Sequence, residues 1–564
     1  MKQLFLLLFI IPLFCLSQNM IEIQLNENKR PIPKTGLNGN TIRGPSWINT
    51  IFNDSVKSMG PDLLRYPGGN VSNYWDWETG WFFDQSVLDT ILLPDTILSP
   101  PQAWSGLSPI DIRPTRFHEA LNQIDSKGIF VLNMMSSSLD NQISSLQNAI
   151  DSGIILNRIE LGSEFNHNNP FSTIRFPTAG DYARECNTWI DSVKGLIPNT
   201  LIGVVAGNRG SEPSRAWRWN DSICSIVNDA DALIWHLYLY LYDTDTTFTD
   251  KQVLAYPFYR VPLYEKWRGF QDTTSIIQNH RLWVTEYNLF DKTTEKVFTN
   301  TWAHVLLLSG INHNLLNNNL VDIMIQHNVS GIFSNFDAID TQNNFRKRSS
   351  GYSSSIWNKQ MKNMNYAQKI IFNSSIVDSV EYQNNNGLIN QVSFPKVFGW
   401  KFSSLNQEKA IIVNISNDTI IIDASSVLPL NSNWICWTSD SIFAHIENFN
   451  YINNDTLFGN QNISLPPYSI STSINLCYND VDMDLICDEL DNCVSIYNPS
   501  QNDFNDDGIG DDCDDINLIE PNTNRRLFKL KDLMGRDVSV VTDFGIKVHI
   551  YDDGTVEKKL IISQ

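Results

Sequence analysis

The fold of this chain is decided by two short apolar runs that each end in a glutamate, Arg158-Ile159-Glu160-Leu161-Gly162-Ser163-Glu164 and Arg281-Leu282-Trp283-Val284-Thr285-Glu286. Each run has the length of a buried parallel strand. In a barrel of such strands, the carboxyl ends meet on one face, where catalytic groups collect. We therefore expect Glu164 and Glu286, 122 positions apart in the chain, to lie close together in space.

Length and composition predict several modules. The chain has 564 residues, of which 42% are hydrophobic, and this exceeds what a single core supports. The formal net charge is −21, and the stretch 477–515 alone contains thirteen Asp or Glu and no Lys or Arg. The rest of the chain is mildly acidic. Because phosphate binding needs clustered Lys and Arg, no nucleic-acid partner is expected.

The amino terminus has the pattern of a secretory signal peptide. Lys2 precedes an apolar run from Leu4 to Leu16, and residues 1–17 are predicted to be removed. A lipid anchor on Cys15 is the alternative, although the bulky Phe14 precedes that cysteine. No later run reaches the roughly 18 to 20 apolar residues of a membrane helix, so no transmembrane helix is expected. The protein is predicted to be secreted or held at the cell surface.

Residues 18–360 alternate short apolar runs with longer segments, which predicts a (β/α)8 TIM barrel. The expected strands lie near Gly39–Ile42, Leu63–Tyr66, Ile129–Met134, Arg158–Leu161, Leu201–Val205, Ala232–Trp235, Leu282–Thr285 and Val321–Ile325. Residues 361–476 change to short alternating strands with polar turns, which predicts a β-sandwich. The early strand Ile21–Leu25 could belong to that sandwich.

The acidic stretch 477–515 has oxygen-bearing side chains at alternate positions, followed by glycine in the sequence Asp507-Gly508. Such spacing suits calcium, which takes six to eight oxygen ligands. The candidate ligands are Asp480, Asp482, Asp484, Asp488, Asp491, Asp503, Asn505, Asp507, Asp511 and Asp514. A solvated acidic linker is the alternative. The chain would otherwise need no cofactor.

This stretch resembles a thrombospondin type 3 repeat, in which calcium replaces a hydrophobic core. The resemblance implies structural calcium and makes Cys493–Cys513 a plausible disulfide. In an exported chain seven cysteines remain after signal removal, and four crowd this segment, namely Cys477, Cys487, Cys493 and Cys513. One departure is Leu485, where the first calcium loop usually has glycine.

A short linker, 516–524, leads to a small carboxyl-terminal β domain, 525–564, with a strand-turn-strand pattern. The elements Asp532-Leu533-Met534-Gly535-Arg536 and Tyr551-Asp552-Asp553-Gly554 resemble the sorting domain of the type IX secretion system of Bacteroidetes. That resemblance implies the type IX secretion machinery as a partner. A merely structural hairpin is the alternative.

Three segments of the barrel, Leu64–Asn70, Glu160–Glu164 and Trp283–Asn288, resemble retaining glycoside hydrolases of clan A, in particular the arabinofuranosidase and heparanase-related branches. Those branches combine a barrel with a β-sandwich. The resemblance implies that Glu164 is the acid/base and Glu286 the nucleophile. Ser163 departs from the pattern, because the clan usually has Asn there, with its amide on the sugar 2-hydroxyl.

Other residues near the expected strand ends are candidates for holding the carboxylates or a carbohydrate. Arg65 could keep Glu286 ionised, whereas a less polar setting would keep Glu164 protonated. The remaining candidates are Asn70, Trp75, Trp77, Asn166, His167, His236 and Tyr238. His236 could equally be a core histidine, and the two tryptophans could equally be core residues rather than sugar platforms.

The sequence thus predicts a secreted retaining glycoside hydrolase that uses two glutamates. A surface adhesin or carbohydrate-binding protein with an inactive barrel is the alternative, and a calcium-stiffened spacer would explain only the tail. The separation of the two carboxyl groups distinguishes mechanisms: about 5 to 5.5 Å indicates retention, and roughly 6.5 to 9.5 Å indicates inversion.

Overall fold

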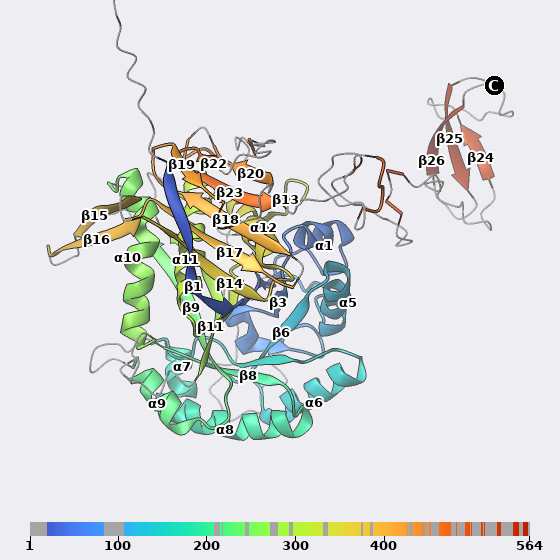
Figure 1. Cartoon of the computed structure of the whole chain (residues 1–564). Coiled ribbons are helices and arrows are strands. Elements are labelled where there is room, and N and C mark those ends of the chain that lie inside the picture. The colour runs from blue at the N-terminus through green and yellow to red at the C-terminus, as the bar shows by residue number, and fades with distance from the viewer. Residues whose placement is uncertain are drawn as a thin grey trace, which may run out of the picture. The chain divides into compact units, whose positions relative to one another are not determined.

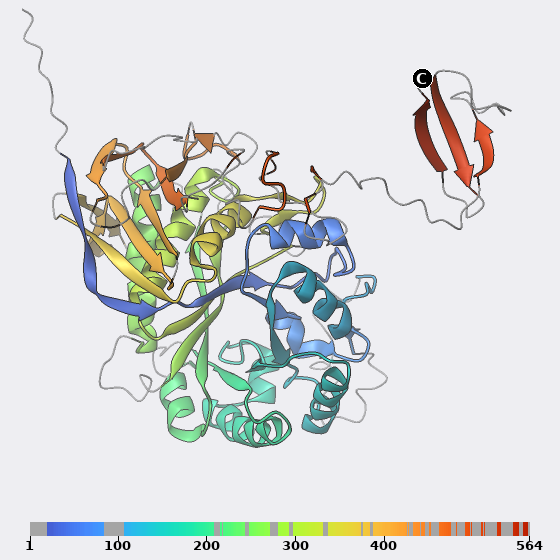
Figure 2. The same ribbon diagram turned by 45° about the vertical axis from the view of Figure 1, so that its right-hand side comes forward.

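The computed structural model describes residues 20–474 with several short breaks and a longer one at 84–106 (Figures 1 and 2). Beyond these it describes parts of 481–513 and three strands between 527 and 561. The chain divides into two compact units, Met1–Asn475 and Leu476–Gln564. The predicted signal peptide lies outside the described residues.

A closed barrel of eight parallel strands forms the centre of the first unit. In chain order the strands are β2 (Lys34–Asn38), β3 (Leu63–Tyr66), β6 (Lys127–Leu132), β7 (Arg158–Leu161), β8 (Leu201–Val205), β9 (Ala232–Leu241), β10 (Arg281–Asp291) and β11 (Val321–Gln326). The last strand pairs in parallel with the first and closes the ring. The predicted barrel is therefore present, with Glu164 three residues after its fourth strand and Glu286 within its seventh.

The first predicted strand, Gly39–Ile42, is wrong, because the barrel begins one segment earlier with β2. That strand reads Lys-Thr-Gly-Leu-Asn and has no apolar run to reveal it. Its glycine, Gly36, packs directly against β3: a Cβ there would lie 2.1 Å from the carbonyl oxygen of Leu63. A strand whose residues allow a neighbouring backbone to come close, rather than bury large apolar side chains, is hard to recognise in the sequence.

Strands β9 and β10 extend further than the sequence predicted. Their parallel pairing starts at Ala232 and Arg281 and continues to Leu241 and Asp291. Along β9, the side chains of Leu237, Leu239 and Leu241 are buried, and the alternate ones are only partly buried. Alternating burial is the signature of a strand with one packed face and one open face, so this extension presents polar and aromatic groups beside Glu286.

Helices follow the barrel strands and cover the barrel from outside (Figure 1). They are α1 (Thr50–Lys57), α5 (Pro114–Ile124), α6 (Leu139–Asp151), α7 (Pro170–Arg175), α8 (Ala179–Leu196), α9 (Trp219–Ile226), α10 (Asp250–Arg268), α11 (Trp302–Asn317) and α12 (Ser349–Met361), with a short 3-10 turn, η1 (Gly69–Tyr74). A capping box, in which Thr249 and Gln252 exchange hydrogen bonds, starts α10. Gly269, with a φ of 77°, ends it.

A nine-stranded sheet packs on the barrel within the same unit. Its order is β21 (Tyr451–Ile452), β20 (Asn433–Trp437), β23 (Ser469–Ile474), β18 (Glu408–Asn414), β17 (Val397–Ser403), β14 (Tyr366–Phe372), β1 (Ile21–Pro31), β19 (Ile420–Asp423) and β22 (Asn462–Leu465). The predicted mostly-β domain is therefore present. It includes β1, so residues 21–31 belong to this sheet rather than to the barrel range of 18–360.

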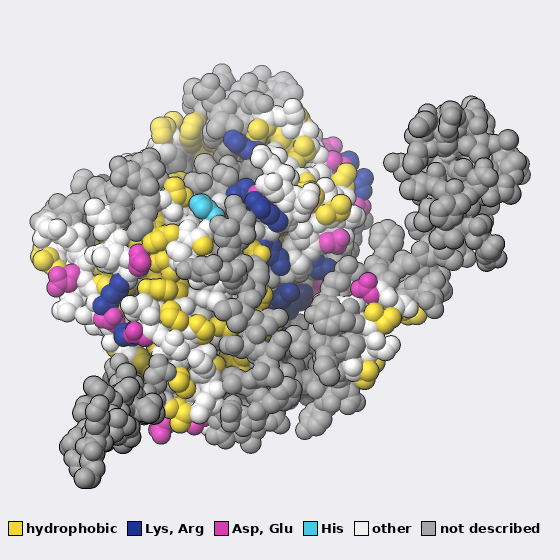
Figure 3. All heavy atoms as spheres, turned by 90° about the horizontal axis from the view of Figure 1, so that it is seen from above, with side chains coloured by type: hydrophobic (Ala, Val, Ile, Leu, Met, Phe, Trp, Pro, Cys, Tyr) yellow, Lys and Arg dark blue, Asp and Glu magenta, His cyan; other side chains and the backbone are white. Residues whose placement is uncertain are grey.

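The sheet domain has its own aliphatic core, contributed by strands from both ends of the sheet. Ile23, Ile412 and Leu465 are among its buried members. On the barrel side, the indole of Trp302 in α11 donates a hydrogen bond of 2.6 Å to the carbonyl oxygen of Tyr468. Figure 3 shows hydrophobic, basic and acidic side chains interspersed on the face seen from above. A short hairpin, β15 (Val377–Gln383) and β16 (Ile389–Pro395), completes the unit.

The second unit contains a disulfide and a small sheet. Cys493 and Cys513 are joined, as the resemblance implied. Cys477 and Cys487 lie outside the described residues. Farther along, β24 (Leu527–Lys531), β25 (Gly545–Tyr551) and β26 (Val556–Ile561) form an antiparallel sheet, one strand more than the strand-turn-strand expectation. No helix among the described residues is long and apolar enough to cross a membrane.

Candidate active site

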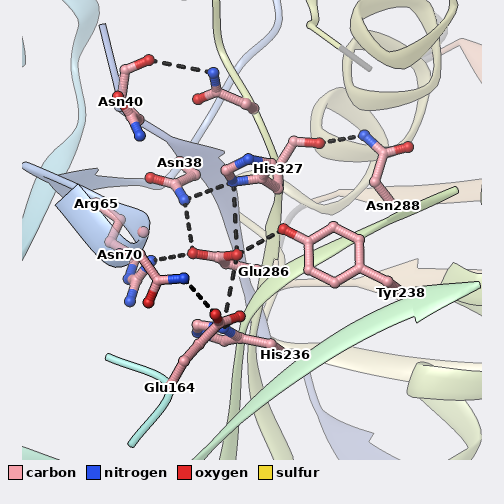
Figure 4. A network of polar contacts seen from close by, with 12 residues as sticks. Asn38, Asn40, Arg65, Asn70, Glu164, His236, Tyr238, Glu286, Asn288 and His327 are labelled. Atoms are coloured by element: carbon pink, nitrogen blue, oxygen red, sulfur yellow. Dashed lines mark hydrogen bonds and ion pairs between the residues drawn. The ribbon is translucent and has the colours of Figure 1, made fainter. Parts of the chain in front are cut away.

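Polar side chains from six barrel strands or the residues just after them converge at one end of the barrel (Figure 4). Glu164 follows β7, and Glu286 lies in β10. The groups that surround these two carboxylates are Asn38 at the end of β2, Arg65 in β3, His236 and Tyr238 in β9, and His327 after β11. The two glutamates are thus brought together as the strand pattern predicted.

The two carboxylates are close enough to share one histidine. Nδ1 of His236 lies 2.9 Å from an oxygen of Glu164 and 3.6 Å from an oxygen of Glu286. One oxygen of each carboxylate and a ring nitrogen of His236 all lie within 4.8 Å of one another. The nearest oxygens of the two carboxylates are thus closer together than the roughly 6.5 to 9.5 Å between the carboxyl groups of inverting glycosidases.

Glu286 is held by hydrogen bonds to both of its oxygens. Arg65 Nη1 donates to Oε1 at 2.7 Å, and Asn38 Nδ2 donates to the same oxygen at 3.2 Å. The hydroxyl of Tyr238 donates to Oε2 at 2.6 Å. Burial alone would raise the pKa of Glu286, but electrostatic interactions with His236, His327 and Arg65 outweigh it and lower the pKa. The carboxylate is therefore ionised at neutral pH and fixed in orientation.

Arg65 is itself held by a second carboxylate that the sequence analysis did not single out. Glu160 on β7 accepts from Nε and Nη2 of Arg65 at 2.9 and 2.7 Å, and both side chains are fully buried. Burial would lower the pKa of Arg65, but Glu160 and Glu286 raise it instead. Arg65 was predicted as a substrate-binding residue. With 0% exposure it cannot reach a ligand, so it positions Glu286.

Glu164 sits in a strained backbone position next to a polar shell. Its φ is +56°, which is uncommon for a residue other than glycine, asparagine or aspartate. Its carboxylate accepts from Asn70 Nδ2 at 2.5 Å and lies 3.3 Å from Nδ1 of His167. Burial would raise the pKa of Glu164, but hydrogen bonds from His167 and His236 lower it well below its usual range. The expectation that a less polar setting keeps Glu164 protonated is therefore wrong.

Ser163, the departure from the family pattern, directly precedes Glu164 in the chain. It is buried, and its backbone exchanges two hydrogen bonds with the side chain of Asn73: Nδ2 donates to the Ser163 carbonyl at 2.9 Å, and the Ser163 amide donates to Oδ1 at 3.2 Å. The amide of Asn73 thereby fixes the turn that presents Glu164. The hydroxyl of Ser163 has no hydrogen-bond partner among the described residues.

His327 and Asn38 are two further polar residues beside Glu286, and neither was predicted from the sequence. Asn38 Nδ2 lies 2.7 Å from His327 Nδ1, and burial lowers the pKa of His327 to about 4. His327 is thus neutral at pH 7. Its carbonyl oxygen accepts from Asn288, whose own Oδ1 lies 2.9 Å from Nε2 of His304. The polar run Gln326-His327-Asn328, directly after the last predicted strand, could have indicated that His327 belongs to the site.

Trp75 and Trp77, predicted as sugar platforms, are core residues. Their exposed fractions are 0% and 3%. The indole of Trp75 donates to the hydroxyl of Tyr66 at 3.0 Å, and the ring of Trp77 packs on Tyr66 and Phe130. Buried tryptophans offer no face to a ligand, so the platform prediction is wrong.

A pocket of about 360 Å³, including space open to solvent, lies beside Glu164. Two of its lining residues, Asn166 and His167, are predicted site residues. Arg268, at the end of α10, also lines it and was not predicted. His167 is half exposed, and its pKa is raised because the contact with Glu164 outweighs burial. The pocket is thus a polar cavity with cationic groups next to a carboxylate.

Two sets of residues have the chemistry of a metal site. Glu164, His236 and Glu286 are close enough to ligate one ion, but Arg65 and Tyr238 already hold the oxygens of Glu286. In the acidic repeat, only Asp491 of the ten predicted calcium ligands lies among the described residues. One of its carboxylate oxygens accepts from the backbone amide of Cys493 at 2.7 Å, next to the disulfide. All-oxygen donors of this kind fit a hard cation such as calcium.

Comparisons with known proteins identify the fold. No protein-family model matches the sequence, and no curated protein does. Solved structures do match. An α-L-arabinofuranosidase from Thermotoga maritima has a TM-score of 0.61 at 14% identity, over 80% of this chain and 99% of that one. A family 51 α-L-arabinofuranosidase from Bifidobacterium longum has a TM-score of 0.60 at 14% identity with the same coverage.

A third structure broadens the set of activities found on this fold. A 4-O-α-L-rhamnosyl-β-D-glucuronidase from Fusarium oxysporum has a TM-score of 0.53 at 11% identity, over 80% of this chain and 99% of that chain. All three neighbours are glycoside hydrolases, two named for arabinofuranosides and the third for a rhamnosyl-glucuronide. The structural similarity establishes a shared glycosidase-like fold, a barrel with a sheet domain. Because sequence identity is this low, the activity has to be argued from the site.

Proposed function

We propose that this protein is a retaining glycoside hydrolase that acts on a polysaccharide or oligosaccharide. The single observation that carries the proposal is the closeness of Glu164, just after the fourth strand, and Glu286, within the seventh, whose nearest carboxylate oxygens lie within 4.8 Å. Paired carboxylates at this separation suit a double displacement. The glycosidase-like fold of the structural neighbours supports the same conclusion.

Glu286 is the nucleophile in this proposal. Its carboxylate is ionised and is held at both oxygens, by Arg65 and by Tyr238. It attacks the anomeric carbon, the glycosidic bond to the leaving oxygen breaks, and a covalent glycosyl-enzyme forms. Fixed orientation by a buried guanidinium lowers the entropic cost of that attack.

Glu164 is the acid/base, and His236 contacts its carboxylate. The lowered pKa of Glu164 means that the proton for the leaving oxygen is not stored on an isolated carboxylic acid. Glu164 delivers that proton while its carboxyl group is in contact with His236, whose Nδ1 is 2.9 Å away. Transfer to the leaving oxygen expels the first product. Glu164 then takes a proton from water, which attacks the glycosyl-enzyme and releases Glu286.

Two carboxylate variants test the proposal. Glu286→Ala and Glu164→Ala should each lose nearly all cleavage of the glycans that the parent protein cleaves, because the first has no nucleophile and the second has no proton donor for the leaving oxygen. Melting temperature and glycan binding are measured in parallel to show that the variants are folded. If both variants cleave as fast as the parent, the proposed function is wrong; if the parent binds glycans without cleaving them, the barrel is a carbohydrate-binding protein instead.

The remaining segments complete the proposal. The chain is exported by means of its amino-terminal signal peptide and a carboxyl-terminal domain that the type IX secretion machinery recognises. The repeat at 477–515 binds structural calcium through its acidic side chains. The disulfide Cys493–Cys513 supports export to an oxidising compartment. Mass spectrometry of the mature protein, secreted by a bacterium with this export system, would test the two export assignments. It would show whether the amino-terminal signal and the carboxyl-terminal domain have been removed.

A further inference from the structure

Arg268 is a cationic side chain that forms no ion pair with the described residues. It lies in the last turn of α10 and lines the pocket beside Glu164. The only hydrogen bond that its guanidinium makes with the described residues is a long one of 3.3 Å, from Nη1 to the carbonyl oxygen of Tyr264. Nε and Nη2 have no such partner, and no acidic side chain among the described residues pairs with Arg268.

Aromatic rings hold this guanidinium in place. It lies 5.2 Å from the ring centroid of Trp235 and 5.4 Å from that of Tyr264. Contacts of this kind orient a cation without neutralising it, so the donors at its free edge stay available. Burial lowers the pKa of Arg268 to about 10, which leaves it charged at neutral pH. A partly buried charge without a counter-ion is costly, and an anionic ligand would relieve that cost.

The position of the pocket indicates which sugar would meet Arg268. The pocket is lined by Glu164 and His236 but not by Glu286. The sugar attacked by Glu286 must lie between both carboxylates, whereas the leaving sugar lies on the side of the acid. Arg268 is therefore on the leaving-group side.

Two neighbours make the pocket more favourable for an anion. Asn166 and His167 line it together with Arg268, and Arg268 is close enough to His167 for its charge to oppose the rise in the pKa of that ring. An amide, an imidazole and a guanidinium thus face the same cavity. Gly207 forms part of its wall, where a Cβ would lie 2.9 Å from Asn166. The cavity is narrow, which suits a single charged group.

We propose that Arg268 forms a subsite for a uronic acid, a sugar bearing a carboxylate, as the leaving-group residue of the substrate. This inference rests on the proposed function. A guanidinium pairs with a planar carboxylate through two parallel hydrogen bonds, and its free edge fits that geometry. A heavily sulfated chain would need several convergent cations, whereas this pocket offers one permanent charge.

The first test compares binding of small probes to the full chain. The Glu286→Gln variant is titrated with glucuronate, galacturonate, glucose and glucose 6-sulfate, and binding is followed by ligand-observed NMR. We expect the uronates to bind at least tenfold more tightly than glucose, and we expect Arg268→Gln, added to the same variant, to abolish that difference. Equal binding of glucose, or tighter binding of the sulfate ester than of the uronates, would overturn the proposal.

Arg260→Gln is the matched control. Arg260 lies on the same helix, contacts Tyr256, Tyr259 and Tyr264 in the same cation-aromatic manner, and does not line the pocket. It should leave the preference for uronates intact, with a similar change in melting temperature. If Arg260→Gln removes the preference as fully as Arg268→Gln does, the effect is structural and the subsite assignment is wrong.

A second test uses turnover. An acidic polysaccharide that the parent protein cleaves is compared with its carboxyl-reduced form, which has the same backbone without charge. We expect kcat/KM to favour the acidic form by at least tenfold, mainly through KM, and Arg268→Gln to remove this ratio. A parent protein that prefers the reduced form contradicts the subsite. Loss of cleavage of both forms with uronate binding retained would count against the proposed hydrolysis and not against Arg268.

Discussion

Glu160 and Glu286 accept hydrogen bonds from different edges of the same buried guanidinium, that of Arg65. Glu160 holds Nε and Nη2, which leaves Nη1 directed at Glu286. The position of the proposed nucleophile therefore depends on a carboxylate three strands away in the chain order of the barrel. Activity and stability should be coupled at this point.

Glu160→Gln tests that coupling. The substitution keeps the shape of the side chain and removes its charge, so Arg65 loses a buried ion pair. We expect the free energy of unfolding to fall by about 3–5 kcal/mol, and kcat to fall by about 100-fold because Glu286 is less well aligned. Chemical denaturation and steady-state kinetics measure the two effects.

The matched control is Asp322→Asn. Asp322 pairs with Arg281 in the same barrel, but their side chains are 38% and 42% exposed. An exposed pair of this kind contributes about 0–1 kcal/mol, and kcat should not change. If Glu160→Gln were as mild as Asp322→Asn in both measurements, Glu160 would have no part in positioning Glu286.

The two glutamates should respond differently to the quality of the leaving group. Glu164→Ala removes proton transfer, so cleavage of ordinary glycosides should drop by about 10²–10⁴-fold. Substrates with an acidic leaving group, such as nitrophenyl glycosides, need no proton donor in the first step and should show a fast burst followed by slow turnover. Glu286→Ala should show no burst with either substrate. The same response in both variants would contradict the assigned roles.

Tyr238→Phe should shift the acid side of the pH profile. The hydroxyl of Tyr238 donates to Glu286 at 2.6 Å and stabilises its charged form. Without this bond the pKa of Glu286 rises, so activity should be lost at a higher pH as the solution is acidified, and kcat should fall by roughly tenfold. The pH dependence of kcat/KM measures the shift. A profile that moves to lower pH would contradict the arrangement.

Stability should fall between about pH 6.5 and pH 4 because of buried neutral histidines. Burial lowers the pKa of His304 to about 3 and that of His327 to about 4, and lowers that of His313 well below its usual range. Below about pH 6.5 these groups protonate in the unfolded chain but not in the folded one. Each histidine therefore removes up to about 1.4 kcal/mol of stability per pH unit as the pH falls through this window.

Unfolding in urea at pH 7, 6 and 5 measures this slope. His304→Gln should reduce it by the share of one histidine, although the variant is less stable overall because the contacts of His304 with Asn288 and Ser349 are altered. A stability that stays constant, or rises, from pH 6.5 to pH 4.5 would show that these histidines are protonated in the folded protein.

Calcium should protect the acidic repeat at 477–515 from proteolysis. With the ion removed by a chelator, thirteen acidic side chains repel one another with no cation to offset them. We expect cleavage within the repeat to accelerate at least tenfold in chelator and to return to its original rate when calcium is added back. Equal rates with and without calcium would contradict the calcium assignment.

The barrel and the pairing of Glu164 with Glu286 could be predicted because apolar runs and terminal acids are local patterns. The first strand could not, since Lys34–Asn38 is defined by the close approach of Gly36 to Leu63 and not by hydrophobicity. Glu160 was visible as a charge in a buried strand, but its partner Arg65 is 95 residues away. Pairing at that range depends on strand order in space.

The electrostatic setting of Glu164 was also beyond local sequence patterns. Its carboxylate is contacted by Asn70 and His236, from loops and strands that precede and follow it by more than 70 residues. Of the two histidines that lower its pKa, His167 is three residues away in the sequence, whereas His236 belongs to a distant strand. Trp75 and Trp77 were wrongly predicted to face the ligand, and both are buried. The local sequence of an aromatic pair near a predicted cleft does not show whether the rings face solvent or the core.

The most direct test of the proposed mechanism is the anomeric configuration of the first product. A glycan that the parent protein cleaves is followed by proton NMR during the first minutes, before mutarotation scrambles the anomers. The closeness of Glu164 and Glu286, within 4.8 Å, predicts a product with the configuration of the substrate. A first product of inverted configuration would contradict the double displacement and with it the role of Glu286 as nucleophile.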